Sequence, residues 1–298
     1  MRVLVSGSTG LIGTELVDRL GRCGHDAVRL VRCTASDTLP SVRWDPSRGE
    51  LDRGALDGIE AIVHLAGESI ASKRWTAAQK TKILESRVDG TSLLADAAAS
   101  MTTPPVVFLS ASAIGYYGDR GDERLDESSP SGDGFAADVA MEWEKATAAI
   151  ENSPTRVAHL RTGIVLSTRG GALAEQLPFF RLGVGGRVGP GRQWFSWITI
   201  EDEVSAIIWL LDHQVNGAVN LTAPNPVPNS EFAKTLGRVL RRPVVLPTPR
   251  PVLWARLGRE LTATLLESSA HVSPTVLESS GFSFAQPELE PALRALLT

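Results

Sequence analysis

The first residues whose spacing could support chemistry are three glycines in the segment VSGSTGLIG: Gly7, Gly10 and Gly13. An apolar segment, RVLVS, precedes them and an amphipathic segment, LIGTELVDRLGRCG, follows, so they are predicted to lie between a strand and a helix. Glycines there allow a tight turn and close approach of the backbone to a pyrophosphate, next to a helix N-terminus with free amides. The segment predicts a dinucleotide site, and a glycine-rich turn without a ligand is the alternative.

Arg32 gives a clue to which dinucleotide would bind. It follows Gly13 by 19 residues, at the end of the predicted second strand DAVRLVR. NAD-specific sites place an acidic residue there to bind the ribose 2′-hydroxyl, whereas a guanidinium can bind a 2′-phosphate. Arg32 therefore favours NADP(H), and a solvated charge at a strand end is the alternative.

The composition indicates a globular protein that acts on small molecules. The 298 residues are 43% hydrophobic and 21% charged, enough for one large domain or two smaller ones. A net charge of −4 without any Lys/Arg run predicts neither nucleic acid nor a membrane as partner. Two cysteines, Cys23 and Cys33, are too few for a disulfide framework or a zinc site. We therefore expect no metal site and, since the N-terminus lacks a signal-peptide pattern, a cytoplasmic location.

Strand-length apolar segments alternate with longer amphipathic ones, which predicts an α/β fold with a doubly wound parallel sheet of the Rossmann type. Thr76 is the expected N-cap of one long helix, and a second long helix begins at Phe135. We expect an NADP-binding domain of residues 1–165 plus 200–222. A smaller, mostly helical domain of residues 166–199 plus 223–298 is expected to cap the substrate.

With HLAG after the fourth predicted strand and SASAIGYYG after the fifth, the sequence resembles the extended short-chain dehydrogenase/reductase superfamily. The segments AGESIASKRWT, ESRVDGT, LRTGIVLS, GRQWFSWITIEDEVSAI and VNLTAPNPVPNSEFAK resemble one atypical branch. That branch comprises NAD-dependent epimerase/dehydratase-like "epimerase family proteins" with a C-terminal module of unknown function. The resemblance covers essentially the whole chain, and it allows a homodimer through the two long helices.

The resemblance also implies a set of residues that contact the cofactor. The pyrophosphate would lie against Thr9, Gly10, Leu11, Ile12 and Gly13, and the adenosine phosphate against Val31 and Arg32. Leu65, Ala66 and Gly67 would lie beside the cofactor. On the first long helix, Arg87 would contact it together with Lys82, and a solvated side chain is the alternative for each of the two.

The catalytic residues of the wider superfamily are only partly present. Its members use a Ser or Thr that orients the substrate oxygen, a Tyr that acts as acid or base, and a Lys four residues later. Ser112 matches the first, with Ser110 as the alternative, but the Tyr and Lys positions hold Phe135 and Val139, which cannot transfer a proton.

Tyr117 is the candidate substitute acid, because the only two tyrosines, Tyr116 and Tyr117, lie in the segment expected to face the nicotinamide. It would need a neighbouring cation, such as Lys73, Arg74 or Arg87, to lower its pKa. The alternative is that both rings only form the wall of the pocket. The acidic residues of the second long helix, Asp138, Glu142 and Glu144, are expected to face solvent or pair with Lys145.

Two functions follow from these features. The first is an NADP(H)-dependent oxidoreductase or epimerase-like enzyme that acts on a small polar metabolite in the cleft between the domains. The second is a non-catalytic NADP(H)-binding sensor or regulator.

Overall fold

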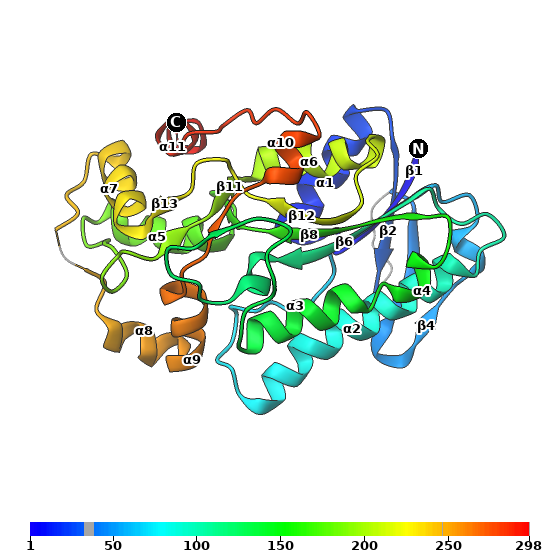
Figure 1. The fold of residues 1–298 in the computed structure, drawn as a ribbon, viewed down its shortest axis with the longest axis horizontal. Helices are drawn as coiled ribbons and strands as arrows, with labels where there is room; N and C mark the ends of the chain where they lie inside the picture. The colour runs from blue at the N-terminus through cyan, green and yellow to red at the C-terminus, as the bar shows by residue number, and fades with distance from the viewer. Residues whose placement is uncertain (33–38, 246, 298) are drawn as a thin grey trace.

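A computed structural model describes residues 1–32, 39–245 and 247–297, so Cys33 lies outside the described residues. Its centre is an eight-stranded sheet in the order β12-β8-β6-β5-β1-β2-β3-β4 (Figure 1). The strands are β1 (Arg2–Ser6), β2 (Asp26–Val31), β3 (Ser41–Asp45), β4 (Glu50–Leu51), β5 (Ala61–His64), β6 (Val107–Ala113), β8 (Arg156–Thr162) and β12 (Gly217–Leu221). All pair in parallel except β4, which runs antiparallel to β3. The predicted doubly wound fold is confirmed.

Helices cover both faces of the sheet (Figure 1). On one face, α1 (Leu11–Arg22) and α6 (Ile200–Asp212) bury aliphatic side chains against the strands. On the other lie α2 (Ala77–Ala99), α3 (Phe135–Lys145) and α4 (Ala148–Glu151). The hydroxyl of Thr76 accepts a hydrogen bond from the amide of Gln79, as expected for an N-cap.

The remaining elements form a cap over the C-terminal edge of the sheet. They are β9 (Ile164–Leu166), α5 (Gly171–Arg181), β10 (Trp194–Phe195), β11 (Trp197–Thr199), β13 (Val227–Pro228), α7 (Asn229–Leu240), α8 (Arg250–Leu257), α9 (Arg259–Thr262), β14 (His271–Val272) and α11 (Leu289–Leu297). Helix α10 (Thr275–Ser279) packs on the sheet instead, with Leu277 in the same core as α6 and β12. A separate hydrophobic core joins α5, α7 and α11 around Trp197 and Phe232. Its buried residues come from the segments predicted to form the smaller domain; the exact division stays a prediction.

The cap contacts the sheet domain at several points. Lys80 of α2 pairs with Glu260 of α9, and Arg169 pairs with Glu15 of α1. Strand β14 also pairs with β7 (Arg124–Leu125), which lies in the segment after β6. Among the described residues, no helix is both long and apolar enough to cross a bilayer.

Candidate functional site

The three glycines form the turn that the sequence predicted. Gly7 has a φ of +66°, and a Cβ there would lie 2.8 Å from the carbonyl carbon of Leu65. A Cβ on Gly13 would lie 2.2 Å from the carbonyl oxygen of Gly7, which accepts the Gly10 amide hydrogen bond at 2.9 Å. Since α1 begins at Leu11 without a side-chain cap, its first amides are open to an anion. The turn fits a pyrophosphate.

Ser6 joins this turn to the chain after β5. Its hydroxyl oxygen accepts the amides of Leu65 and Ala66 at 3.0 and 3.1 Å and lies 2.7 Å from Nδ1 of His64. With both lone pairs used, the hydroxyl proton must point to Nδ1, so the imidazole proton is on Nε2. His64 is fully buried, and burial lowers its pKa to about 4. A neutral histidine therefore fixes the segment predicted to lie beside the cofactor.

Arg87 lies under the same segment. Its Nη1 donates hydrogen bonds to the carbonyl oxygens of Glu68 and Ile83 at 2.9 and 3.1 Å, and its guanidinium lies 4.7 Å from the Trp143 ring centroid. A Cβ on Gly67 would be 3.3 Å from the guanidinium carbon. Burial lowers the pKa of Arg87 to about 10, partly opposed by the charge of Glu68. The cation is thus brought to the predicted cofactor edge.

The other predicted cofactor residues differ in position. Thr9 is exposed, whereas Leu11 and Ile12 are half-buried at the start of α1. Val31 ends β2, and Arg32 follows it with an exposed side chain. Lys82 lies on the exposed side of α2, whereas Arg87 is buried, so the structure does not bring these two side chains together.

Ser112 belongs to a buried polar cluster. Its hydroxyl donates a 2.7 Å hydrogen bond to Oε1 of Glu144. Arg161, whose Cα lies opposite that of Ser112 in the sheet, donates from Nε and Nη2 to the two oxygens of the Glu144 carboxylate at 2.8 and 2.9 Å. The Arg161 and Glu144 side chains are only 5% and 12% exposed. The expectation that Glu144 faces solvent or pairs with Lys145 is wrong, because its neighbour across the sheet face is a buried cation; Lys145 pairs with Glu142 instead.

Tyr117 lies in the same cluster, and the expected cations are not beside it. Its hydroxyl donates to Oδ1 of Asn220 at 2.7 Å and accepts from Nη1 of Arg161 at 3.1 Å. Burial raises its pKa to about 12 despite the opposing effect of Arg161. The side chain is fully buried, because its segment turns inward through a 3₁₀ helix, Ile114–Tyr117. Tyr116 is only half-buried, with the Arg161 guanidinium 3.5 Å from its ring centroid.

The three expected cations contact other groups. Lys73 lies 3.9 Å from Glu68, Arg74 donates to the carbonyl oxygen of Arg256, and Arg87 bonds as described above. The alternative serine, Ser110, is fully buried, and its hydroxyl donates a long, 3.4 Å hydrogen bond to the carbonyl oxygen of Ala111. Of the two serines, Ser112 is therefore the one whose hydroxyl bonds to the carboxylate of the polar cluster.

The positions of the absent Tyr and Lys have become packing positions. Phe135 packs edge-to-face on Trp75 at 4.9 Å, with the ammonium of Lys80 5.0 Å from its ring centroid. Val139 is buried. Neither residue offers a proton to the site.

Sequence reasoning missed Glu144, Arg161 and a second buried carboxyl, Glu203. Glu203 on α6 is fully buried; it accepts a 2.8 Å hydrogen bond from Thr162, and burial raises its pKa to about 8. The available signal was a charged residue at an inward position of an apolar element, as in RVAHLRT and EDEVSAII. Among the described residues, no group of three or more His, Cys, Asp or Glu side chains could hold a metal ion.

Comparison with known proteins now gives the family. The model of the NAD dependent epimerase/dehydratase family matches residues 3–222, and a domain of unknown function, DUF1731, matches residues 248–296. The chain belongs to the NAD dependent epimerase/dehydratase family. The resemblance found in the sequence is confirmed, including the C-terminal module of unknown function.

Within this family, the chain is 38% identical to an epimerase family protein of Mycobacterium bovis, covering 98% of this chain and 96% of that protein. It is 36% identical to the human epimerase family protein SDR39U1 over the full length of both. A crystal structure of human SDR39U1 (isoform 2) with NADPH superimposes with a TM-score of 0.91 at 34% identity, covering 99% of each chain. A nucleoside-diphosphate sugar epimerase of Corynebacterium glutamicum gives a TM-score of 0.81 at 36% identity, and this chain spans 58% of its length.

Proposed function

We propose that this protein binds NADP(H) and is an oxidoreductase or epimerase-like enzyme acting on a small polar metabolite. The observation that carries the proposal is the turn of Gly7, Gly10 and Gly13, which is too tightly packed for a Cβ at Gly7 or Gly13 and leads into the uncapped N-terminus of α1, where the first amides are open to a pyrophosphate. The NADPH in the human SDR39U1 structure supports the same cofactor. Bound there, NADP(H) would supply or accept a hydride.

The cofactor would contact the residues predicted from the sequence. The pyrophosphate would lie on Thr9, Gly10, Leu11, Ile12 and Gly13, the 2′-phosphate near Val31 and Arg32, and Arg87 beneath Leu65, Ala66 and Gly67. The exposed position of Arg32, without a carboxylate partner among the described residues, supports its role toward a phosphate. Lys82 could contact the cofactor only if its side chain reached around α2 from the exposed side.

The substrate would lie in the cleft between the sheet domain and the cap, at the carboxyl ends of β6 and β8. We propose that Ser112 binds the reacting oxygen, and that Glu144 moves the proton. In oxidation, the substrate hydroxyl gives its proton to Oγ of Ser112 as Ser112 gives its own to Glu144; reduction reverses both transfers. The burial and raised pKa of Tyr117 favour a positioning role for it over the acid role.

A direct test is titration of the protein with NADPH and NADH, comparing wild type with Arg32→Ala. We expect Arg32→Ala to lose at least 10-fold in NADPH affinity, since a charge-assisted contact to a phosphate is worth about 1.5–3 kcal/mol. NADH affinity should stay the same. The matched control is Arg22→Ala, which removes an exposed arginine at the C-terminal end of α1, away from the glycine turn. Absent or equal binding of the two nucleotides would refute the cofactor assignment.

The second candidate is a non-catalytic NADP(H) sensor, supported by Phe135 and Val139 at the Tyr and Lys positions. It predicts a partner whose affinity differs between the NADP⁺ and NADPH forms. The enzyme proposal predicts turnover that Ser112→Ala abolishes without weakening NADPH binding. A homodimer and a cytoplasmic location stay predictions from the sequence.

A further inference from the structure

Two segments of the cap carry many cations and no carboxylate. Residues 176–200 contain three arginines, and residues 232–259 contain seven lysines or arginines, with no Asp or Glu in either segment. Because the whole chain carries −4, these ten cations leave −14 on the rest of the molecule. Over the whole cap, residues 166–199 and 223–298, twelve lysines or arginines stand against seven glutamates, so the cap carries +5 and the rest of the molecule −9.

Several of these cations have no carboxylate partner within the described part of the chain. Arg238, Arg250 and Arg256 pair with glutamates elsewhere in the chain. Among the described residues, the other seven have no carboxylate within ion-pair distance, and five of them lie on α5 and α7 or in the chain that follows each: Arg181, Arg187, Lys234, Arg241 and Arg242. Such charges are free to meet an anionic surface.

Exposed aliphatic side chains lie among these cations. Leu182 is 77% exposed, Val184 66% and Val245 82%. The two segments adjoin, since a Cβ on Gly183 would lie 3.9 Å from the Pro243 ring. We call Leu182, Val184, Val245 and the five unpaired cations the basic-aliphatic face. It belongs to α5, α7 and the chain that follows each of them, at the end of the molecule away from the N-terminus (Figure 1).

A small cavity opens on this face. It measures about 220 Å³ and is lined by Arg187, Ser230, Lys234, Val244 and Val245. Two cations and a hydroxyl beside two valines suit a phosphate that is attached to an apolar body.

We propose that the basic-aliphatic face binds the surface of an anionic phospholipid bilayer. Leu182, Val184 and Val245 lie outside the helices and strands and would enter the boundary between headgroups and acyl chains, while the surrounding cations meet lipid phosphates. The cavity would take one headgroup phosphate between Arg187 and Lys234. No run of lysines or arginines predicts this face in the sequence, because apart from the adjacent Arg241 and Arg242 its cations are spaced singly along the chain and only the fold gathers them. This inference does not depend on the proposed function.

The test is co-sedimentation of the full chain with vesicles of phosphatidylcholine, alone or mixed with phosphatidylglycerol. We expect binding to the mixed vesicles only, weakened by salt. Removing two charges with Arg241→Gln/Arg242→Gln should weaken it roughly 30-fold, the effect of two basic residues at an anionic surface. Leu182→Ser/Val245→Ser should also weaken binding, but the dependence of binding on salt should stay unchanged.

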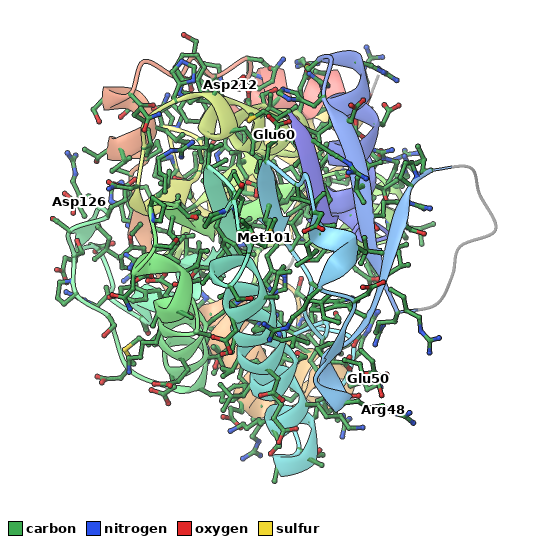
Figure 2. All side chains as sticks on the ribbon, turned by 90° about the vertical axis from the view of Figure 1, so that its right-hand side faces the viewer. Arg48, Glu50, Glu60, Met101, Asp126 and Asp212 are labelled. Carbon is green, nitrogen blue, oxygen red and sulfur yellow. The ribbon has the colours of Figure 1, made fainter. Side chains whose placement is uncertain are left out.

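The matched control is Arg48→Gln/Arg53→Gln, which removes the same charge from the opposite end, where Figure 2 labels Arg48. It should leave vesicle binding unchanged. The proposal is overturned if the mixed vesicles bind no protein, if this control weakens binding as much, or if an acidic polypeptide binds the face while vesicles do not. NADPH affinity is measured on the same preparations. A loss of vesicle binding with unchanged NADPH affinity therefore concerns the basic-aliphatic face and not the cofactor site.

Discussion

Replacing Arg161 by methionine should strongly destabilise the protein, because it leaves the Glu144 carboxylate buried without its cation. The two side chains are 5% and 12% exposed and share two hydrogen bonds of 2.8 and 2.9 Å. Removing one partner of such a buried pair costs about 3–5 kcal/mol. The variant also removes the donor to the Tyr117 hydroxyl and the cation over the Tyr116 ring. We therefore expect the upper part of that range in urea unfolding.

The attribution to the pair is checked by a double-mutant cycle. Glu144→Gln alone should also be costly, since it leaves the Arg161 guanidinium buried without a counter-charge. The double variant should fall short of the sum of the single effects by about 2 kcal/mol. A loss below about 1 kcal/mol for Arg161→Met, or additivity within about 0.5 kcal/mol, would refute this account of the cluster.

Three further predictions concern the cofactor turn and two buried titratable groups. Gly13→Ala should abolish tight NADPH binding, because its Cβ would lie 2.2 Å from the Gly7 oxygen. The control is Gly21→Ala, whose Cβ would have no atom within 4 Å. It should bind NADPH normally, and its free energy of unfolding in urea should rise by about 0.5–1 kcal/mol. His64 is neutral when folded, so the unfolding free energy should fall as pH drops from about 6.5 to 4, and His64→Leu should flatten that slope. Glu203, whose folded pKa is raised to about 8, should have the opposite effect: stability falls as pH rises from about 4.5 to 8, and Glu203→Gln should remove the loss in pH-dependent unfolding curves.

The features that the sequence predicted well depend on neighbours in the chain. The glycine turn, its strand and its helix lie within the first 22 residues, and the Thr76 cap depends on an amide three residues away. Spacing alone carries that information. The doubly wound fold followed from the alternation of apolar and amphipathic segments, which is also a local signal.

The features that were missed depend on the pairing of distant strands. Arg161 meets Ser112 only because β8 pairs with β6 in one register, and Glu144 joins them only because α3 packs on that face. Tyr117 was expected beside cations near residue 74, but the fold places it against Arg161, 44 residues away. A single sequence does not give the register of strands so far apart, so these partners could not be foreseen.

The same cluster bears on the choice between enzyme and sensor. At Phe135 and Val139 of α3, aromatic and aliphatic packing replaces the usual proton donor and its lysine, yet the helix still sends one carboxylate into the site, at Glu144. A pure sensor needs no carboxylate behind Ser112, and keeping one buried requires Arg161 to compensate its charge. An enzyme without the tyrosine does need a proton acceptor at this place. The cluster therefore favours catalysis through Ser112 and Glu144.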